Sequence, residues 1–141
     1  MRKEINFRAK SLKDGTWHYG FVIPFADEIA LLYERSIDDP TICGLTSIDV
    51  DQNTVGQFTG LYDKDGQKIF EGDIIGCENP KIKHLVFYNE KQGRFCAALN
   101  GDTEKDFFGV CGFDDARWNA SKKVIGNIFD NPYLFDEKWK E

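Results

Sequence analysis

The sequence has no pair of cysteines at the spacing that a structural zinc site needs. Such sites usually draw two ligands from one short knuckle, and no two cysteines of this chain are close enough along it to form one. We therefore expect no metal site, and we expect the cysteines to be small buried apolar residues of a reduced protein. They are Cys43, Cys77, Cys96 and Cys111.

Long apolar runs are also missing. No stretch approaches the roughly 20 apolar residues that a membrane-spanning helix requires. The beginning of the chain, MRKEINFRAK, contains no apolar core of a secretion signal. These two absences predict a cytoplasmic protein with no membrane partner.

Motifs of the common catalytic classes are absent as well. The chain has no GxxxxGK phosphate loop, no GxGxxG dinucleotide turn, no HExxH zinc motif and no GxSxG nucleophile elbow. We therefore assign no catalytic residues, no metal ligands and no cofactor, and binding is favoured over catalysis. The net charge of −6 removes the simplest argument for nucleic acid, which proteins bind by neutralising phosphates with Lys and Arg.

What the chain does have is aromatic residues. Phe occurs 12 times, and apolar residues make up 41% of the chain, which is enough to bury a core. Aromatic side chains fit the half-covered surface of a sheet, and the β-forming segments are short and separated by Gly, Asn and Pro. The sequence predicts a mainly β fold. Its core would be small and barrel-like (SH3-like) or a sandwich of short antiparallel strands, with or without one short helix in the first third.

The first segment, INFRAKSLKDGTWHYGFVIPF, is typical of a β-hairpin. Apolar residues alternate with polar ones on both sides of Asp14-Gly15. Asp-Gly between two strands favours a tight type I′ turn, in which both central residues have positive φ. The next segment, 25–36, stays ambiguous: its apolar residues fit one face of a helix, and the run IALLYE fits a strand equally well.

The stretch FTGLYDKDGQKIFEGDIIG, residues 58–76, is dense in acids and glycines. It lacks the first and last ligands of an EF-hand loop, so we expect a turn at Asp65-Gly66 followed by one strand over KIFEGDIIGCE. In that strand Glu71 and Asp73 would share a face. With a histidine they would give an alternative function, a small metal-dependent hydrolase. The opposing interpretation is that these acids accept hydrogen bonds from turn amides.

A second hairpin is expected over HLVFYNEKQGRFCAAL, with Gly93 in its tip. Basic residues alternate here with aromatic ones, a combination that small barrels use to bind single strands. This gives another alternative function, single-stranded nucleic-acid binding through the hairpin at 81–95. The candidate residues are Lys81, Lys83, Phe87, Tyr88, Lys91 and Arg94.

Three stretches resemble the YopX family, small proteins of phages and prophages. TVGQFTGLYDKDGQKIFEGDII is similar to the central signature of that family, MRKEINFRAKSLKDGTWHYGFVI to its opening, and KVIGNIFDNPYLF to its closing segment. The resemblance implies a mainly β architecture, a mobile-element origin in a bacterial host, and no known activity. It marks a signature turn to which no role is assigned, made of Gly60, Asp63, Asp65, Gly66, Glu71, Gly72 and Asp73.

We therefore expect one YopX-like domain over residues 1–141, with a variable segment at 25–48 and a frayed tail at 136–141. The expected function is that of a phage or prophage accessory protein in the bacterial cytoplasm, non-enzymatic and acting by binding a macromolecule. A protein partner or self-association is favoured over nucleic acid.

Overall fold

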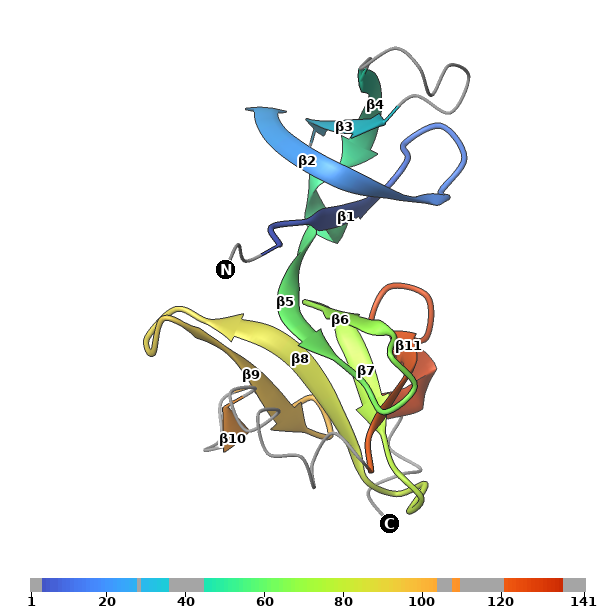
Figure 1. Ribbon diagram of the computed structural model, residues 1–141, viewed down its shortest axis with the longest axis vertical. Coiled ribbons are helices and arrows are strands. Elements are labelled where there is room, and N and C mark those ends of the chain that lie inside the picture. The colour runs from blue at the N-terminus through green and yellow to red at the C-terminus, as the bar shows by residue number, and fades with distance from the viewer. Residues whose placement is uncertain (1–3, 28, 36–44, 104–107, 110–120, 136–141) are drawn as a thin grey trace. The chain divides into compact units, whose positions relative to one another are not determined.

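Two compact units make up the chain, Met1–Phe58 and Thr59–Glu141. Whether the two units form the single domain expected over 1–141 is not tested by this division, so that expectation stays a prediction. The structure, a computed structural model (Figure 1), describes residues 4–27, 29–35, 45–103, 108–109 and 121–135. The expected frayed tail at 136–141 lies outside the described residues, and so do Cys43 and Cys111.

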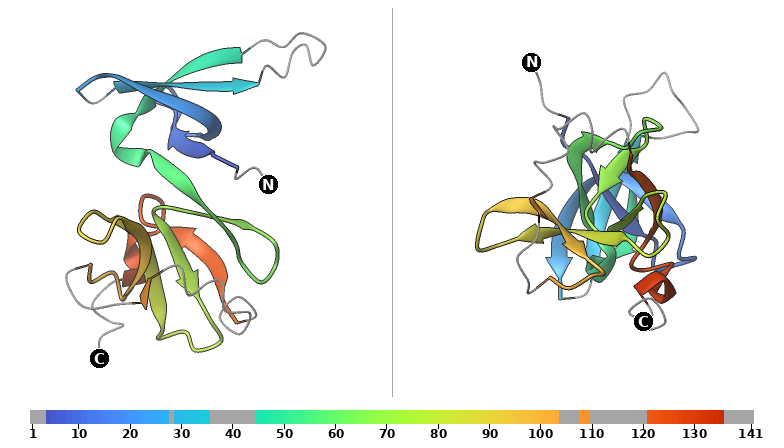
Figure 2. Two further views of the ribbon diagram at one scale, coloured as in Figure 1. Left: turned by 60° about the vertical axis from the view of Figure 1, so that its left-hand side comes forward. Right: turned by 90° about the horizontal axis from the view of Figure 1, so that it is seen from below.

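The first unit is an antiparallel sheet in which neighbouring strands follow the order β4-β3-β2-β1-β5. A single turn of 3-10 helix, η1, leads from β4 into β5, and β5 continues into the second unit. Figure 2 shows the curvature of these strands in two further directions. The bounds are β1 Phe7–Lys10, β2 Trp17–Ala26, β3 Ile29–Arg35, β4 Leu45–Asp51, η1 Gln52–Thr54 and β5 Gly56–Tyr62.

The hairpin of β1 and β2 confirms the predicted hairpin but not its predicted turn. The loop closes where Ser11 N donates to Thr16 O at 2.8 Å and Gly15 N donates to Ser11 O at 2.9 Å. Gly15 has a φ of 71°, and Asp14 does not have a positive φ. The type I′ turn is therefore wrong: the loop is longer than two residues, and one left-handed glycine at its end is enough to close it.

Strand β2 changes its partner at Gly20. The part up to Gly20 pairs with β1, and the part from Phe21 onward pairs with β3. A Cβ on Gly20 would overlap the carbonyl oxygen of Tyr33 and lie 3.3 Å from the Cα of Glu34. The bend therefore depends on glycine, because only a residue without a side chain lets the two backbones approach so closely.

The ambiguous segment 25–36 contains strand and no helix over its described residues: it holds the end of β2, a turn at Asp27 and β3. Strand β3 pairs with β4 along its whole length, from Ile29 opposite Asp51 to Arg35 opposite Leu45. Ala30 and Leu32 are fully buried, and the residues that alternate with them, Ile29, Leu31 and Tyr33, are half-buried. The helical alternative is wrong because burial alternates with a period of two, as it does in a strand with one covered face.

The core of the first unit lies on one face of this sheet. An isolated bridge joins Ser11 to Val50, and Leu12 N donates to Asp49 O at 3.0 Å. These contacts bring the end of β1 to β4, although β2 and β3 lie between them in the sheet, so the sheet curves around its apolar face. The residues fully buried there are Ala9, Ala30, Leu32 and Val50.

The second unit contains a five-stranded antiparallel sheet with the order β10-β9-β8-β7-β11, while β6 adjoins the later part of β5. Its apolar core comprises Ile69, Ile75, Val86 and Ala97. A 3-10 helix, η3, follows β11. The bounds are β6 Lys68–Phe70, β7 Asp73–Gly76, β8 Lys83–Asn89, β9 Arg94–Leu99, β10 Phe108–Gly109, β11 Lys123–Asn127 and η3 Pro132–Phe135.

The strand predicted over KIFEGDIIGCE is interrupted at Glu71-Gly72. Strand β6 belongs with β5, and β7 belongs to the five-stranded sheet. Gly72 is buried with a φ of 92°. Its N–H donates to Val86 O at 2.7 Å, and its carbonyl accepts from Ile128 N at 2.9 Å. The expected continuous strand is wrong because this turn carries the chain from one sheet into the other.

The predicted second hairpin is confirmed. Strands β8 and β9 pair in register from His84 opposite Leu99 to Asn89 opposite Arg94, and Gly93 in the tip has a φ of 65°. The prediction of a mainly β fold of short antiparallel strands is likewise confirmed, and the described strands form two sheets and no closed barrel. Within the described part of the chain, no helix has the length and hydropathy to cross a membrane.

Candidate functional site

The signature turn is organised around the buried side chain of Asp63. Its Oδ1 accepts hydrogen bonds from the backbone N–H groups of Asp65 and Gln67, both at 2.9 Å. Its Oδ2 accepts from the N–H of Val124 on β11 at 3.0 Å. The carboxylate therefore joins the turn between β5 and β6 to β11, a strand far along the chain. Both of its oxygens accept hydrogen bonds from backbone N–H groups.

The glycines of the signature turn adopt left-handed backbone conformations. Gly60, Gly66 and Gly72 have φ values of 88°, 82° and 92°, which side chains disfavour. Gly66 N donates to Asp63 O at 3.0 Å and so closes the turn. The glycines are explained by backbone geometry, without a ligand.

The two acids proposed for a hydrolase are also part of the backbone architecture. Asp73 is 1% exposed, and its Oδ2 accepts from the N–H of Phe70 at 2.7 Å. Glu71 lies in the turn and Asp73 begins β7, so they are not alternate residues of one strand as predicted. Among the described residues, no three His, Cys, Asp or Glu side chains are grouped so that they could hold a metal ion. The geometry favours the interpretation that Asp73 accepts a turn amide.

His84, one of the two histidines considered for that hydrolase, lies on β8 opposite Ile75. It is 7% exposed. Burial lowers the pKa of His84, and the charge of Lys122 lowers it further. Its imidazole is thus held neutral within the sheet.

We expect the second unit to lose stability as the pH falls below the ordinary histidine range of about 6.5. Because the pKa of His84 is lowered by folding, the unfolded chain takes up the proton first, and stability declines until the folded chain is protonated too. Urea unfolding at pH 7.5 and pH 5.5 measures the decline. In His84→Leu the decline should be smaller, and an equal decline in that variant would contradict the assignment.

The structure does not bring the predicted nucleic-acid residues onto one surface. Strand alternation and the register of β8 with β9 place Lys83, Phe87 and Arg94 on one face of the sheet. Tyr88 lies on the opposite face, where its ring meets that of Phe95 with centroids 5.4 Å apart, edge to face.

The lysines of that set are also separated along the hairpin. Lys83 is 5% exposed, its Nζ donates to Pro80 O, and burial lowers its pKa. Lys81 lies in the turn before β8, and Lys91 lies in the tip between β8 and β9. The six residues are divided between the two faces of the sheet and between the two ends of the hairpin. They therefore form no continuous basic and aromatic surface.

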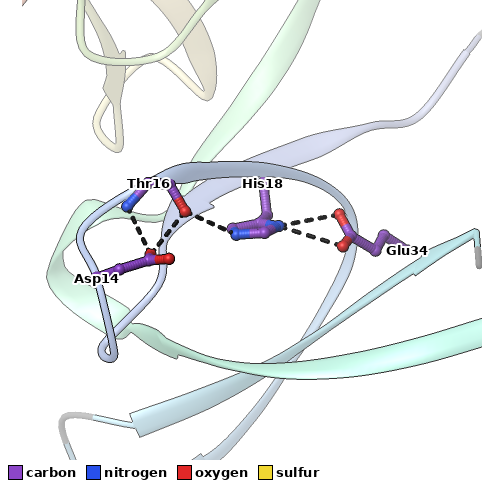
Figure 3. Close-up of polar contacts among 4 residues, drawn as sticks. All are labelled: Asp14, Thr16, His18 and Glu34. Carbon is purple, nitrogen blue, oxygen red and sulfur yellow. Dashed lines mark hydrogen bonds and ion pairs between the residues drawn. The ribbon is translucent and has the colours of Figure 1, made fainter. Parts of the chain in front are cut away.

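A polar network that sequence reasoning missed lies at the bend of β2 (Figure 3). Oδ1 of Asp14 accepts from the N–H of Thr16 at 3.0 Å and from its hydroxyl at 2.7 Å. The hydroxyl oxygen lies 3.0 Å from Nε2 of His18, and Nδ1 of His18 lies 3.1 Å from the carboxylate of Glu34 on β3. The pKa of Asp14 is lowered, first by the side-chain hydrogen bond from Thr16 and then by the backbone one.

The order Glu34, His18, Thr16 is that of an acid, a histidine and a hydroxyl in a nucleophilic triad. In a triad the hydroxyl gives its proton to the histidine. Here the hydroxyl of Thr16 donates to Asp14 instead, and Thr16 is exposed to water. The network is therefore arranged to hold a proton on the imidazole, not to remove one from the hydroxyl.

One face of β2 carries a row of exposed apolar side chains. The first three occupy alternate positions of regularly paired strand and therefore point to the same side of the sheet, and the fourth follows at the register shift between Pro24 and Ala26. Their exposed fractions are 49% to 61%, far above those of core residues. We call this row the β2 face, and it consists of Tyr19, Phe21, Ile23 and Phe25.

The β2 face continues toward β1 into a basic and aromatic edge. The register of β1 with β2 sets Arg8 opposite Tyr19 and Lys10 opposite Trp17. The guanidinium of Arg8 lies 4.7 Å from the centre of the Trp17 ring, and Nζ of Lys10 lies 5.4 Å from it. Cation–π contacts of this kind fix the orientation of the ring, so one end of the face is firmly ordered.

These features define a small, mainly β protein with two antiparallel sheets in its described part, whose signature turn is structural and whose strand β2 carries a row of exposed apolar side chains. The model of the YopX protein family matches residues 6–136. The chain therefore belongs to the YopX family, as the three sequence stretches indicated.

A solved structure has the same fold. It is the crystal structure of protein EF1440 from Enterococcus faecalis, with a TM-score of 0.55 and 24% sequence identity, covering 96% of this chain and all of that one. At that identity the likeness extends to the fold alone. No curated protein matches the chain.

Proposed function

We propose that the chain is a non-enzymatic binding protein that docks a protein partner through the β2 face. The observation that carries the proposal is the row of exposed side chains at Tyr19, Phe21, Ile23 and Phe25. Contiguous exposed apolar surface is uncommon on soluble proteins and often marks an interaction site. The family membership supports a role as a phage or prophage accessory protein in the bacterial cytoplasm.

The chemistry of the β2 face favours protein over nucleic acid. Aromatic side chains supply much of the binding energy at protein interfaces, and Ile23 adds an aliphatic side chain that offers no stacking surface to a base. Two cations adjoin the row, Arg8 and Lys10, and both lie against Trp17 at one end. Burial of the row against a partner would remove its apolar area from water, which is the main driving force of association.

The double substitution Phe21→Ser and Phe25→Ser should weaken binding of a partner protein at least roughly 30-fold, since a central aromatic residue contributes about 2 kcal/mol or more. A photo-crosslinking residue placed at Phe21 first captures the partner in bacteria. Isothermal titration with the purified partner then compares the wild-type chain with the variant.

The matched control is Tyr133→Ser, because Tyr133 is 62% exposed in the other unit and lies outside the proposed surface. Equal affinity of the double variant and the wild-type chain would reject the β2 face as the docking surface. Crosslinks only between copies of the chain, lost in the double variant, would identify a second copy as the partner.

A further inference from the structure

The network of Asp14, Thr16, His18 and Glu34 connects three parts of the first unit. Asp14 and Thr16 belong to the loop between β1 and β2, His18 to the part of β2 paired with β1, and Glu34 to β3. The network thus links the loop and the β1-paired part of β2 to β3 (Figure 3), beside Gly20, where β2 changes its partner. The side chains of His18 and Glu34 are 24% and 21% exposed, so the pair is shielded but accessible to protons.

The protons of this network can be assigned from its donors and acceptors. The Thr16 hydroxyl donates to Asp14 and has only one proton, so towards His18 it acts as an acceptor. Nε2 of His18 must then donate to it, and Nδ1 must donate to the carboxylate of Glu34. Both ring nitrogens carry a proton only in the imidazolium form. The observed set of contacts therefore corresponds to a charged His18.

We infer that His18 is a pH-responsive clamp, which in its protonated form ties the loop between β1 and β2 to β3 across the bend of β2. This goes beyond the proposed function, because His18 lies on the opposite side of β2 from the β2 face. The clamp needs a proton on each ring nitrogen, and histidine is in general the side chain whose charge changes between about pH 5 and 8.

Loss of the proton changes the network at a defined place. With Nδ1–H still directed at Glu34, the unprotonated Nε2 becomes an acceptor, and the hydroxyl of Thr16 donates its hydrogen bond to it. The hydroxyl then turns away from Asp14, which keeps the N–H of Thr16 as a donor. The loop thus loses the hydrogen bond from the Thr16 hydroxyl to Asp14. The carboxylates of Asp14 and Glu34 then no longer have a positive charge on His18 between them.

Charged groups reach His18 from β3 and from the loop between β1 and β2, but not from β1. Glu34 faces it from β3 and Asp14 from the loop. Across β1 its register partner is Ala9, which carries no charge, while Arg8 and Lys10 alternate to the other face. The charged groups facing His18 are thus anionic, and the carboxylate of Glu34 is placed to accept the N–H of Nδ1.

The test is amide hydrogen exchange of the isotopically labelled full chain at pH 5.5 and pH 8.0, corrected for the intrinsic exchange rate. Protection of the Thr16 and Gly15 amides should be roughly tenfold lower at pH 8.0, the effect of one lost charge-assisted hydrogen bond. Imidazole ¹⁵N shifts should show both nitrogens of His18 protonated at pH 5.5 and one at pH 8.0.

Two variants distinguish the clamp from a general effect of pH. His18→Gln should abolish the difference in protection, whereas His84→Leu, which alters the other histidine, should retain it. Glu34→Gln gives a second test: protection at pH 5.5 should fall toward the value at pH 8.0. Equal protection at both pH values in the wild-type chain, or an unchanged difference in a folded His18→Gln, would overturn the inference.

Discussion

Replacing Gly20 with alanine is expected to destabilise the first unit by roughly 3 kcal/mol, the upper range for a forced steric overlap in a packed region. The added Cβ would collide with the carbonyl oxygen of Tyr33, and it would lie 3.0 Å from the carbon of that carbonyl. Both are backbone atoms of β3, so no rotation of a side chain relieves the overlap. Either β2 must straighten or its pairing with β3 must separate.

Hydrogen exchange of core amides measures this effect for each unit. The amides of Ala30 and Leu32 should exchange faster in Gly20→Ala, while those of Ile75 and Val86 should be unaffected. Gly15→Ala is the matched control, because Gly15 has a φ of 71° and nothing lies within 4 Å of its added Cβ. That change should cost only about 1 kcal/mol of backbone strain. Equal losses in the two variants would contradict the role given to the bend.

Replacing Asp63 with asparagine is expected to destabilise the second unit by about 3 kcal/mol, since hydrogen bonds to a charged acceptor contribute more than neutral ones. The asparagine oxygen can still accept from Asp65 and Gln67 in the turn. Its amide group would then direct an N–H at the N–H of Val124, which now donates to Oδ2. The link between the turn and β11 is lost, and a donor that the carboxylate satisfied is left facing another donor.

Urea unfolding followed by circular dichroism provides the measurement, with exchange of the Val124 amide as the local probe. Asp65→Asn is the control, because Asp65 lies in the same turn with an exposed side chain and should change stability by less than roughly 0.5 kcal/mol. A loss of stability in Asp65→Asn as large as in Asp63→Asn would show that the charge of the turn matters more than the hydrogen bonds of Asp63.

Local chemistry made the hairpins predictable. Both loops have the same pattern: a side chain at the loop entrance accepts from the N–H two residues on, and a glycine at the exit is left-handed. Ser11 and Gly15 follow this pattern in the first hairpin, and Asn89 and Gly93 in the second. Each loop is determined within a few residues, so a sequence window contains all the necessary information.

Contacts between distant residues were not predictable in this way. His18 and Glu34 are in contact because β3 returns antiparallel beside β2. Asp63 and Val124 are in contact because β11 is added at the edge of the five-stranded sheet, next to β7. The predicted nucleic-acid set stays a prediction, but the structure divides its residues for a related reason. It counted basic and aromatic residues along the hairpin, but the alternation of side chains across a strand divides them between two faces.

The turn at Gly72 has a consequence for how the second unit folds during synthesis. The carbonyl of Gly72 accepts its hydrogen bond from the N–H of Ile128, and the carboxylate of Asp63 accepts one from the N–H of Val124. Both donors are synthesised more than fifty residues after their acceptors. While the ribosome is still making the residues between, the five-stranded sheet lacks its edge strand β11, and these buried groups remain hydrated. Contacts of such long sequence separation form late and slowly. The second unit should therefore acquire its protection only after the last strand has emerged, whereas the first unit contains all of its own strand partners and can fold before it.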